Sequence, residues 1–60
     1  MINFQEQKLP NNSYRYTCIF HSINICIDSD NKRTEEEIED FLYSRSIKWL
    51  IDNEGYIINL

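Results

Sequence analysis

The sequence predicts one small α+β domain in which an antiparallel sheet is covered by a single helix, in the order ββαββ. Three observations predict it: residues typical of strands fill Tyr14–Asp28, a helix-capping pattern begins at Thr34, and a turn with a glycine stands at Asp52–Gly55. With 60 residues the chain forms a single domain, residues 1–60, and its core is expected to be thin.

Strands are predicted for most of the first half. Ile2–Lys8 opens with alternating apolar and polar residues and is expected to be an edge strand, and Leu9–Ser13 is a cluster of turn formers. Tyr14–Asp28 is expected to be strand through most of its length. A hairpin about His21–Ser22 is the alternative, but no glycine marks it, so we favour one long strand, bulged where needed.

The helix is predicted to run from about Thr34 to Tyr43 or Ser44. Thr34 followed by Glu37 is a capping box, and acidic residues in the first turn suit the helix dipole. The apolar residues at helical spacing, which should face the sheet, are Ile38, Phe41 and Leu42.

A hairpin is predicted at the end of the chain. Its strands are Ile47–Ile51 and Tyr56–Leu60, and Asp52–Gly55 joins them as a type I turn with a left-handed glycine. Alternation along the first of these strands makes Trp49 the expected largest core residue.

Charge and composition exclude several functions. Ten acidic and six basic residues give a formal net charge of −4, which repels a phosphate backbone, so we expect no direct nucleic-acid binding. Met1–Pro10 lacks the features of a secretory signal, and no segment approaches the roughly 20 apolar residues of a membrane span. We therefore expect a cytoplasmic protein that does not enter a membrane.

Metal, cofactor and catalytic sites are not expected. In one continuous strand Cys18 and His21 would point to opposite faces, and Cys18 and Cys26 would share a face but lie roughly 26 Å apart, beyond disulfide reach. Both are expected to be buried free thiols. A calcium-binding loop that begins at Asp28 is not expected, because Lys32 and Arg33 occupy two positions that such a loop needs for other residues.

The acidic helix is the candidate binding site. Opposite its buried stripe lie Glu36, Glu39, Asp40 and Tyr43, which give a negative surface with an aromatic residue in it. Such a surface can be an ordinary solvated helix face. It can also dock in the basic groove of a nucleic-acid-binding protein, with Tyr43 as its anchor.

The residues that match a known family are Ser13-Tyr14, Thr17 and Leu42-Tyr43. Through these residues the chain resembles, over about half its length, the small uracil-DNA glycosylase inhibitors of Bacillus phages. The resemblance implies an acidic inhibitor in the host cytoplasm that imitates DNA and grips a loop residue of the enzyme in an apolar pocket. Tyr43 is the matching position, and Phe41 is a shifted candidate for a pocket aromatic. The turn at Asp52–Gly55 has no counterpart in that family.

Other binding functions use the same features. An anti-CRISPR, anti-restriction or antitoxin-type inhibitor needs the same negative helix on a small scaffold. A structural or assembly module would instead add an edge strand, Ile2–Lys8 or Tyr56–Leu60, to its partner. The many aromatic residues of so small a domain also predict a homodimer at micromolar concentrations.

Overall fold

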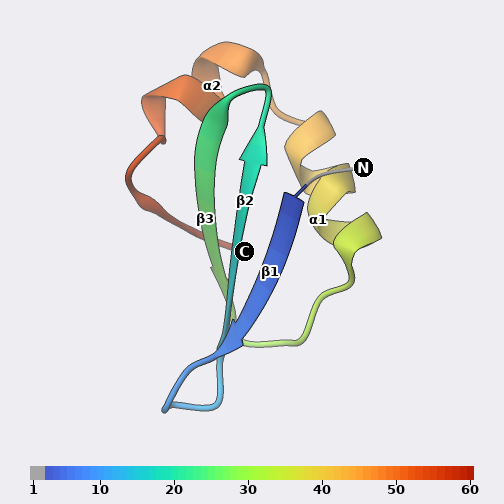
Figure 1. Cartoon of the computed structure of the whole chain (residues 1–60), viewed down its shortest axis with the longest axis vertical. Coiled ribbons are helices and arrows are strands. Elements are labelled where there is room, and N and C mark those ends of the chain that lie inside the picture. The colour runs from blue at the N-terminus through green and yellow to red at the C-terminus, as the bar shows by residue number, and fades with distance from the viewer. Residues whose placement is uncertain (1–2) are drawn as a thin grey trace.

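Three strands, two helices and a short fourth strand follow one another in the computed structural model, which describes residues 3–60 (Figure 1). In chain order they are β1 (Asn3–Lys8), β2 (Tyr14–Phe20), β3 (Ile23–Ser29), α1 (Glu35–Tyr43), α2 (Ile47–Asp52) and β4 (Ile57–Asn59). The strands form one sheet in the order β1-β2-β3-β4, antiparallel except between β3 and β4. The α+β class is confirmed, but the order ββαββ and the purely antiparallel sheet are wrong.

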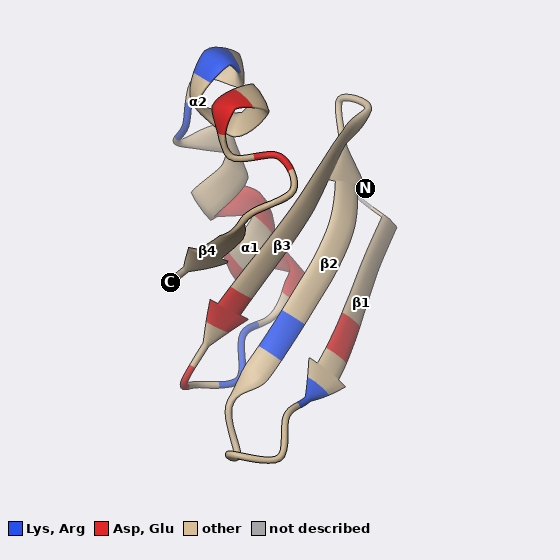
Figure 2. Ribbon diagram, turned by 90° about the vertical axis from the view of Figure 1, so that its left-hand side faces the viewer, with Lys and Arg blue, Asp and Glu red and all other residues tan. Residues whose placement is uncertain are grey.

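The edge strand predicted at Ile2–Lys8 is β1, although Ile2 lies outside the described residues. Helix α1 packs on one face of the sheet, and α2 lies beside the β2–β3 turn (Figure 1). The opposite face of the sheet has no helix over it (Figure 2). The parallel pairing of β3 and β4 follows from this connection, because the two helices carry the chain back to the end of the sheet where β3 begins, so that β4 can run in the same direction as β3 (Figure 1).

The segment predicted as one long strand is a hairpin. Phe20 pairs with Ile23, and the two residues between them, His21 and Ser22, have left-handed φ angles of 49° and 65°. Two residues with positive φ make the type I′ turn that suits the twist of a tight hairpin, and this turn normally selects Asn and Gly. The prediction was wrong because the turn uses two residues that seldom adopt this conformation.

This turn predicts a stabilising substitution. Ser22→Gly should raise the free energy of unfolding by about 0.5–1 kcal/mol, because glycine adopts positive φ without the steric cost that serine has. The matched control is Ser44→Gly, where φ is −79°, and the same change should lower stability by a similar amount. Chemical denaturation measures both, and a less stable Ser22→Gly variant would contradict the reading of the turn.

The last hairpin was also wrongly predicted, because Ile47–Ile51 begins helix α2. Ser46 caps this helix by accepting a hydrogen bond from the backbone N–H of Trp49 at 3.1 Å. Leu50 is fully buried, whereas the ends of the predicted strand are exposed. Gly55 does adopt a left-handed φ, of 85°, but it lies between α2 and β4 rather than inside a hairpin.

The core lies between the sheet and the helices. Its fully buried large side chains are Tyr16, Ile27, Ile38, Leu42 and Leu50. Ile38 and Leu42 therefore confirm the predicted buried stripe of α1, while Phe41 is only partly buried. Trp49 is not the largest core residue, because it too is partly buried and packs on the edge of the core against Phe41.

Candidate functional site

Helix α1 carries the candidate site, and its first turn is held by the predicted capping box. The Thr34 hydroxyl accepts from the backbone N–H of Glu37 at 3.1 Å, and the Glu37 carboxylate accepts from the backbone N–H of Thr34 at 2.9 Å. Both bonds satisfy donors that the start of a helix leaves free. The local sequence therefore fixes where the helix begins.

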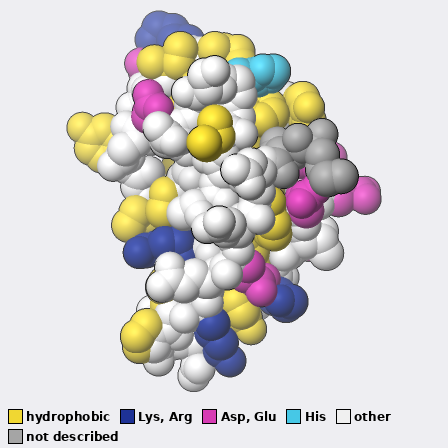
Figure 3. Space-filling view, viewed as in Figure 1, with side chains coloured by type: hydrophobic (Ala, Val, Ile, Leu, Met, Phe, Trp, Pro, Cys, Tyr) yellow, Lys and Arg dark blue, Asp and Glu magenta, His cyan; other side chains and the backbone are white. Residues whose placement is uncertain are grey.

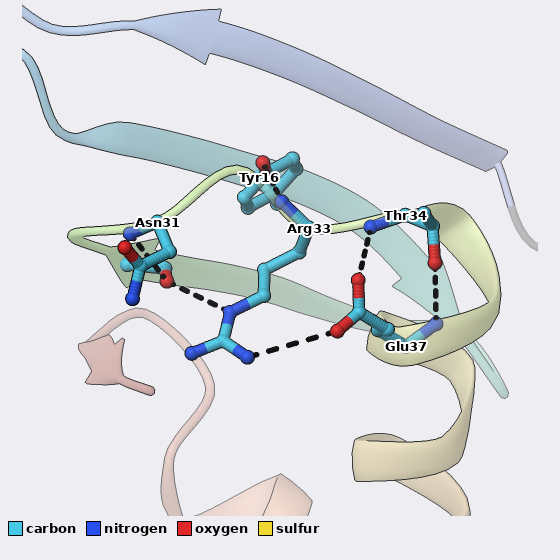
Figure 4. Close-up of polar contacts among 6 residues, drawn as sticks. Tyr16, Asn31, Arg33, Thr34 and Glu37 are labelled. Atoms are coloured by element: carbon cyan, nitrogen blue, oxygen red, sulfur yellow. Dashed lines mark hydrogen bonds and ion pairs between the residues drawn. The ribbon is translucent and has the colours of Figure 1, made fainter.

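The loop before α1 ties the helix to the sheet (Figure 4). The backbone N–H of Arg33 donates to the Tyr16 hydroxyl at 2.6 Å, and its guanidinium donates to the Ser29 hydroxyl at 3.0 Å and pairs with Glu37 at 3.7 Å. The Tyr16 hydroxyl in turn donates to Glu6 at 3.0 Å, and burial raises the pKa of Tyr16. These contacts fix the position of α1 relative to β1, β2 and β3.

The structure brings four of the five predicted site residues together. Glu36, Asp40 and Tyr43 are exposed, and Glu39 is half-buried on the same side of α1. Acidic side chains gather over this helix at the right-hand edge of Figure 3. Phe41 is not among them, because it packs at the boundary of the core with its ring edge-on to Trp49 at a centroid distance of 6.2 Å.

Tyr43 is largely exposed, but its ring also contacts the core. Its side chain is 65% exposed, yet its ring meets the ring of buried Phe20 edge-on at 5.1 Å. His21 also contacts Phe20, with the two ring centroids 4.3 Å apart and the rings edge-on. The sequence analysis did not include His21 in the binding site, because only the turn at His21–Ser22 brings its ring against Phe20.

The basic residues compensate only one of the five carboxylates of α1. Four of them form ion pairs within residues 3–60, namely Arg15–Asp28, Lys32–Glu6, Arg33–Glu37 and Lys48–Asp52. The other two lie over aromatic rings, Lys8 over Tyr14 and Arg45 over Phe41 and Trp49. The acidic residues of α1 without an ion pair in this part of the chain are Glu35, Glu36, Glu39 and Asp40.

The unpaired carboxylates of α1 are closely spaced. From Glu35 to Asp40 the helix rises roughly 7.5 Å, so its four unpaired carboxylates have a mean spacing of roughly 2.5 Å along the axis. Duplex DNA carries one phosphate charge per roughly 1.7 Å of its axis. A protein groove shaped for DNA therefore meets about two thirds of the negative charge per unit length of DNA on α1.

A groove of about 530 Å³ lies elsewhere, on the face of the sheet that has no helix over it. It runs past Thr17, Ile19, Cys26 and Ile57, and Tyr56 forms part of its wall. None of the five predicted site residues lines it. This groove therefore does not include Phe41 or Tyr43, the residues that the family resemblance assigns to an apolar pocket.

The hairpin also separates the two free cysteines. Cys18 is buried on the helix side, where burial raises its pKa to about 11, and Cys26 faces the groove. The prediction that they share a face is wrong. Residues 3–60 hold no group of three His, Cys, Asp or Glu side chains arranged to hold a metal ion.

No helix within residues 3–60 is both long and apolar enough to span a membrane. Comparisons of the chain with protein-family models, with curated proteins and with solved structures gave no match.

Proposed function

We propose that the protein is a non-enzymatic inhibitor that docks helix α1 in the basic groove of a nucleic-acid-binding host protein. The observation that carries this proposal is the group of unpaired carboxylates on α1 beside the exposed ring of Tyr43. The carboxylates would occupy the positions of phosphates, and the bound protein would keep DNA or RNA out of the groove.

The surroundings of the site favour docking over a merely solvated helix. Binding costs less when the contacting groups are ordered beforehand. Here the loop contacts of Arg33 hold the start of α1, and the ring of Phe20 holds Tyr43 at its end. Tyrosine is enriched among residues that dominate binding energies, so Tyr43 is the proposed anchor.

Uracil-DNA glycosylase is the most specific proposed target, through the family resemblance at Leu42-Tyr43. The inhibitor would act by occlusion alone, with no chemical step. The same surface would serve against a CRISPR nuclease, a restriction enzyme or a ribonuclease toxin, since each offers a basic groove for nucleic acid.

The test is inhibition of purified bacterial uracil-DNA glycosylase on a uracil-containing oligonucleotide, with the protein titrated at ionic strengths of about 0.01 M and about 1 M. We expect stoichiometric inhibition at low salt and much weaker inhibition at high salt, because the Debye length falls from roughly 30 Å to roughly 3 Å. Inhibition that does not change with salt would contradict charge mimicry. No inhibition at excess protein would discard the glycosylase and direct the same titration to the other enzyme classes.

A further inference from the structure

The face of the sheet away from α1 differs in chemistry from the rest of the surface. Strand alternation and register place the following side chains on this open face: Asn3, Gln5, Gln7, Arg15, Thr17, Ile19, Asn24, Cys26, Asp28, Ile57 and Asn59. Only two of these are charged, and they pair with each other, Arg15 Nε to Asp28 Oδ1 at 2.7 Å. The other charge next to the open face is at its edge, where the Glu54 carboxylate accepts a hydrogen bond from Asn24 Nδ2 at 3.2 Å. The open face therefore carries little net charge in a chain whose net charge is −4.

Apolar side chains cross the open face in one stripe. Cys26 is opposite Ile57 on β4 and diagonal to Ile19 on β2, whose direct partner is Asn24. Ile19 is 52% exposed, Ile57 is 49% exposed, and Tyr56 beside the stripe is 69% exposed. An aromatic residue and a low density of charge are what distinguish the centre of a protein interface from ordinary surface.

We propose that the open face is the interface of a symmetric homodimer, with Tyr56 of each copy packed in the groove of the other. The distribution of charge over the surface is the reason to choose a second copy of this chain as the partner. Two copies with net charge −4 repel each other wherever their α1 helices meet, but on their open faces Arg15 and Asp28 balance each other and only Glu54, at the edge, adds a negative charge. A face with one positive and one negative side chain is also complementary to itself after a two-fold rotation.

The area of the open face is at the lower end of the areas that specific protein interfaces bury. Four strands at about 4.8 Å spacing and about six residues at 3.3 Å rise give a planar area of roughly 400 Å² per copy. Side chains and the wall that Tyr56 forms enlarge the accessible area, which brings the total for two copies to roughly 1,000 Å². Interfaces of this size are weak, so we expect dissociation in the micromolar range.

The dimer goes beyond the proposed inhibition and is independent of it. Its two α1 helices lie on the outside, because α1 and the open face are on opposite sides of the sheet (Figures 1 and 2). Each dimer therefore presents two acidic surfaces. The failure of one proposal leaves the other standing, since Tyr43 and Tyr56 belong to different surfaces.

Sedimentation equilibrium from about 1 μM to about 1 mM tests the proposal. We expect a concentration-dependent dimer that Ile19→Lys weakens at least about tenfold, because the variant places a charge in the apolar stripe. Ile47→Lys makes the same change at a position that is 47% exposed and does not line the groove, and it should keep the wild-type dissociation constant. A wild-type monomer throughout, or equal effects of the two variants, would overturn the proposal.

A second pair of variants separates the two surfaces. Tyr56→Ala should weaken the dimer and leave inhibition of the target unchanged, whereas Tyr43→Ala should do the reverse. The two tyrosines are matched in exposure, 69% and 65%. A Tyr56→Ala variant that dimerises like the wild type would show that Tyr56 is not in the interface, and would overturn the proposed packing.

Cross-linking through Cys26 gives an independent readout. Packed sheets lie about 10 Å apart, too far for a direct disulfide but within reach of a bismaleimide with a spacer of about that length. We expect cross-linked dimer from the wild type and none from Cys26→Ser, since the thiol of Cys18 is buried on the other face. Absence of cross-linking at concentrations where the dimer is populated would contradict a face-to-face interface.

Discussion

Replacing Leu50 with alanine is expected to remove about half of the free energy of unfolding. Leu50 is the only buried residue of α2, and its exposed fraction is zero. Truncating a buried leucine costs roughly 2–5 kcal/mol, and a domain of 60 residues has roughly 3–9 kcal/mol in total. The variant should therefore populate the unfolded state measurably at 25 °C, which chemical denaturation followed by circular dichroism will show.

The neighbouring residue supplies the control for this experiment. Ile51 belongs to the same helix but is 54% exposed, so Ile51→Ala should change stability by no more than about 0.5 kcal/mol. Equal losses from the two variants would mean that α2 does not pack through Leu50. That result would also remove the reason why Ile47–Ile51 is helical.

Neutralising the exposed face of α1 is expected to weaken inhibition of the target by at least about tenfold at low salt. The variant combines Glu36→Gln, Glu39→Gln and Asp40→Asn, which remove three negative charges with little change in helix propensity. Because rim charges act on association rate and on salt dependence, the loss should shrink as ionic strength rises. Tyr43→Ala alone should cost well over about 1 kcal/mol of binding free energy, and this loss should persist at high salt.

The control is a variant that also loses three negative charges, but outside α1. Asp30→Asn, Asp52→Asn and Glu54→Gln remove three charges outside α1, and exposed pairs such as Lys48–Asp52 contribute little to stability. This variant should inhibit almost as well as the wild type. If both triple variants lose inhibition equally, net charge rather than the α1 surface would be responsible. Unchanged inhibition by Tyr43→Ala would rule out Tyr43 as the anchor.

Short-range signals in the sequence account for the elements that were predicted correctly. The capping box of Thr34 and Glu37 involves residues three apart, so no distant contact is needed to start α1. The spacing of Ile38 and Leu42 selects the buried side of that helix and leaves the acidic residues on the other side. For the same reason the sequence alone could place Glu36, Glu39, Asp40 and Tyr43 on the outer side of the helix. That this side binds a partner stays a prediction.

A competing local pattern explains the error in the last third. Ile47, Trp49 and Ile51 alternate as a strand would, yet Ser46 caps a helix there. Serine is a preferred helix-capping residue, but the sequence analysis did not consider Ser46 in that role. It relied on the alternation, which is unreliable over so few residues.

The sequence by itself determined the acidic helix, its start and its exposed face, because these depend on neighbours within one or two turns. Only the tertiary structure decided that His21 and Ser22 form a turn, since two residues adopt left-handed φ there in order to pair β2 with β3. That turn pairs Cys18 with Ile25 and Cys26 with Thr17, which places the two cysteines on opposite faces, and it forms the open face of the sheet. Burial of Leu50 likewise selects helix over strand for α2, because burying its side chain in the core requires contacts with residues far away in the chain.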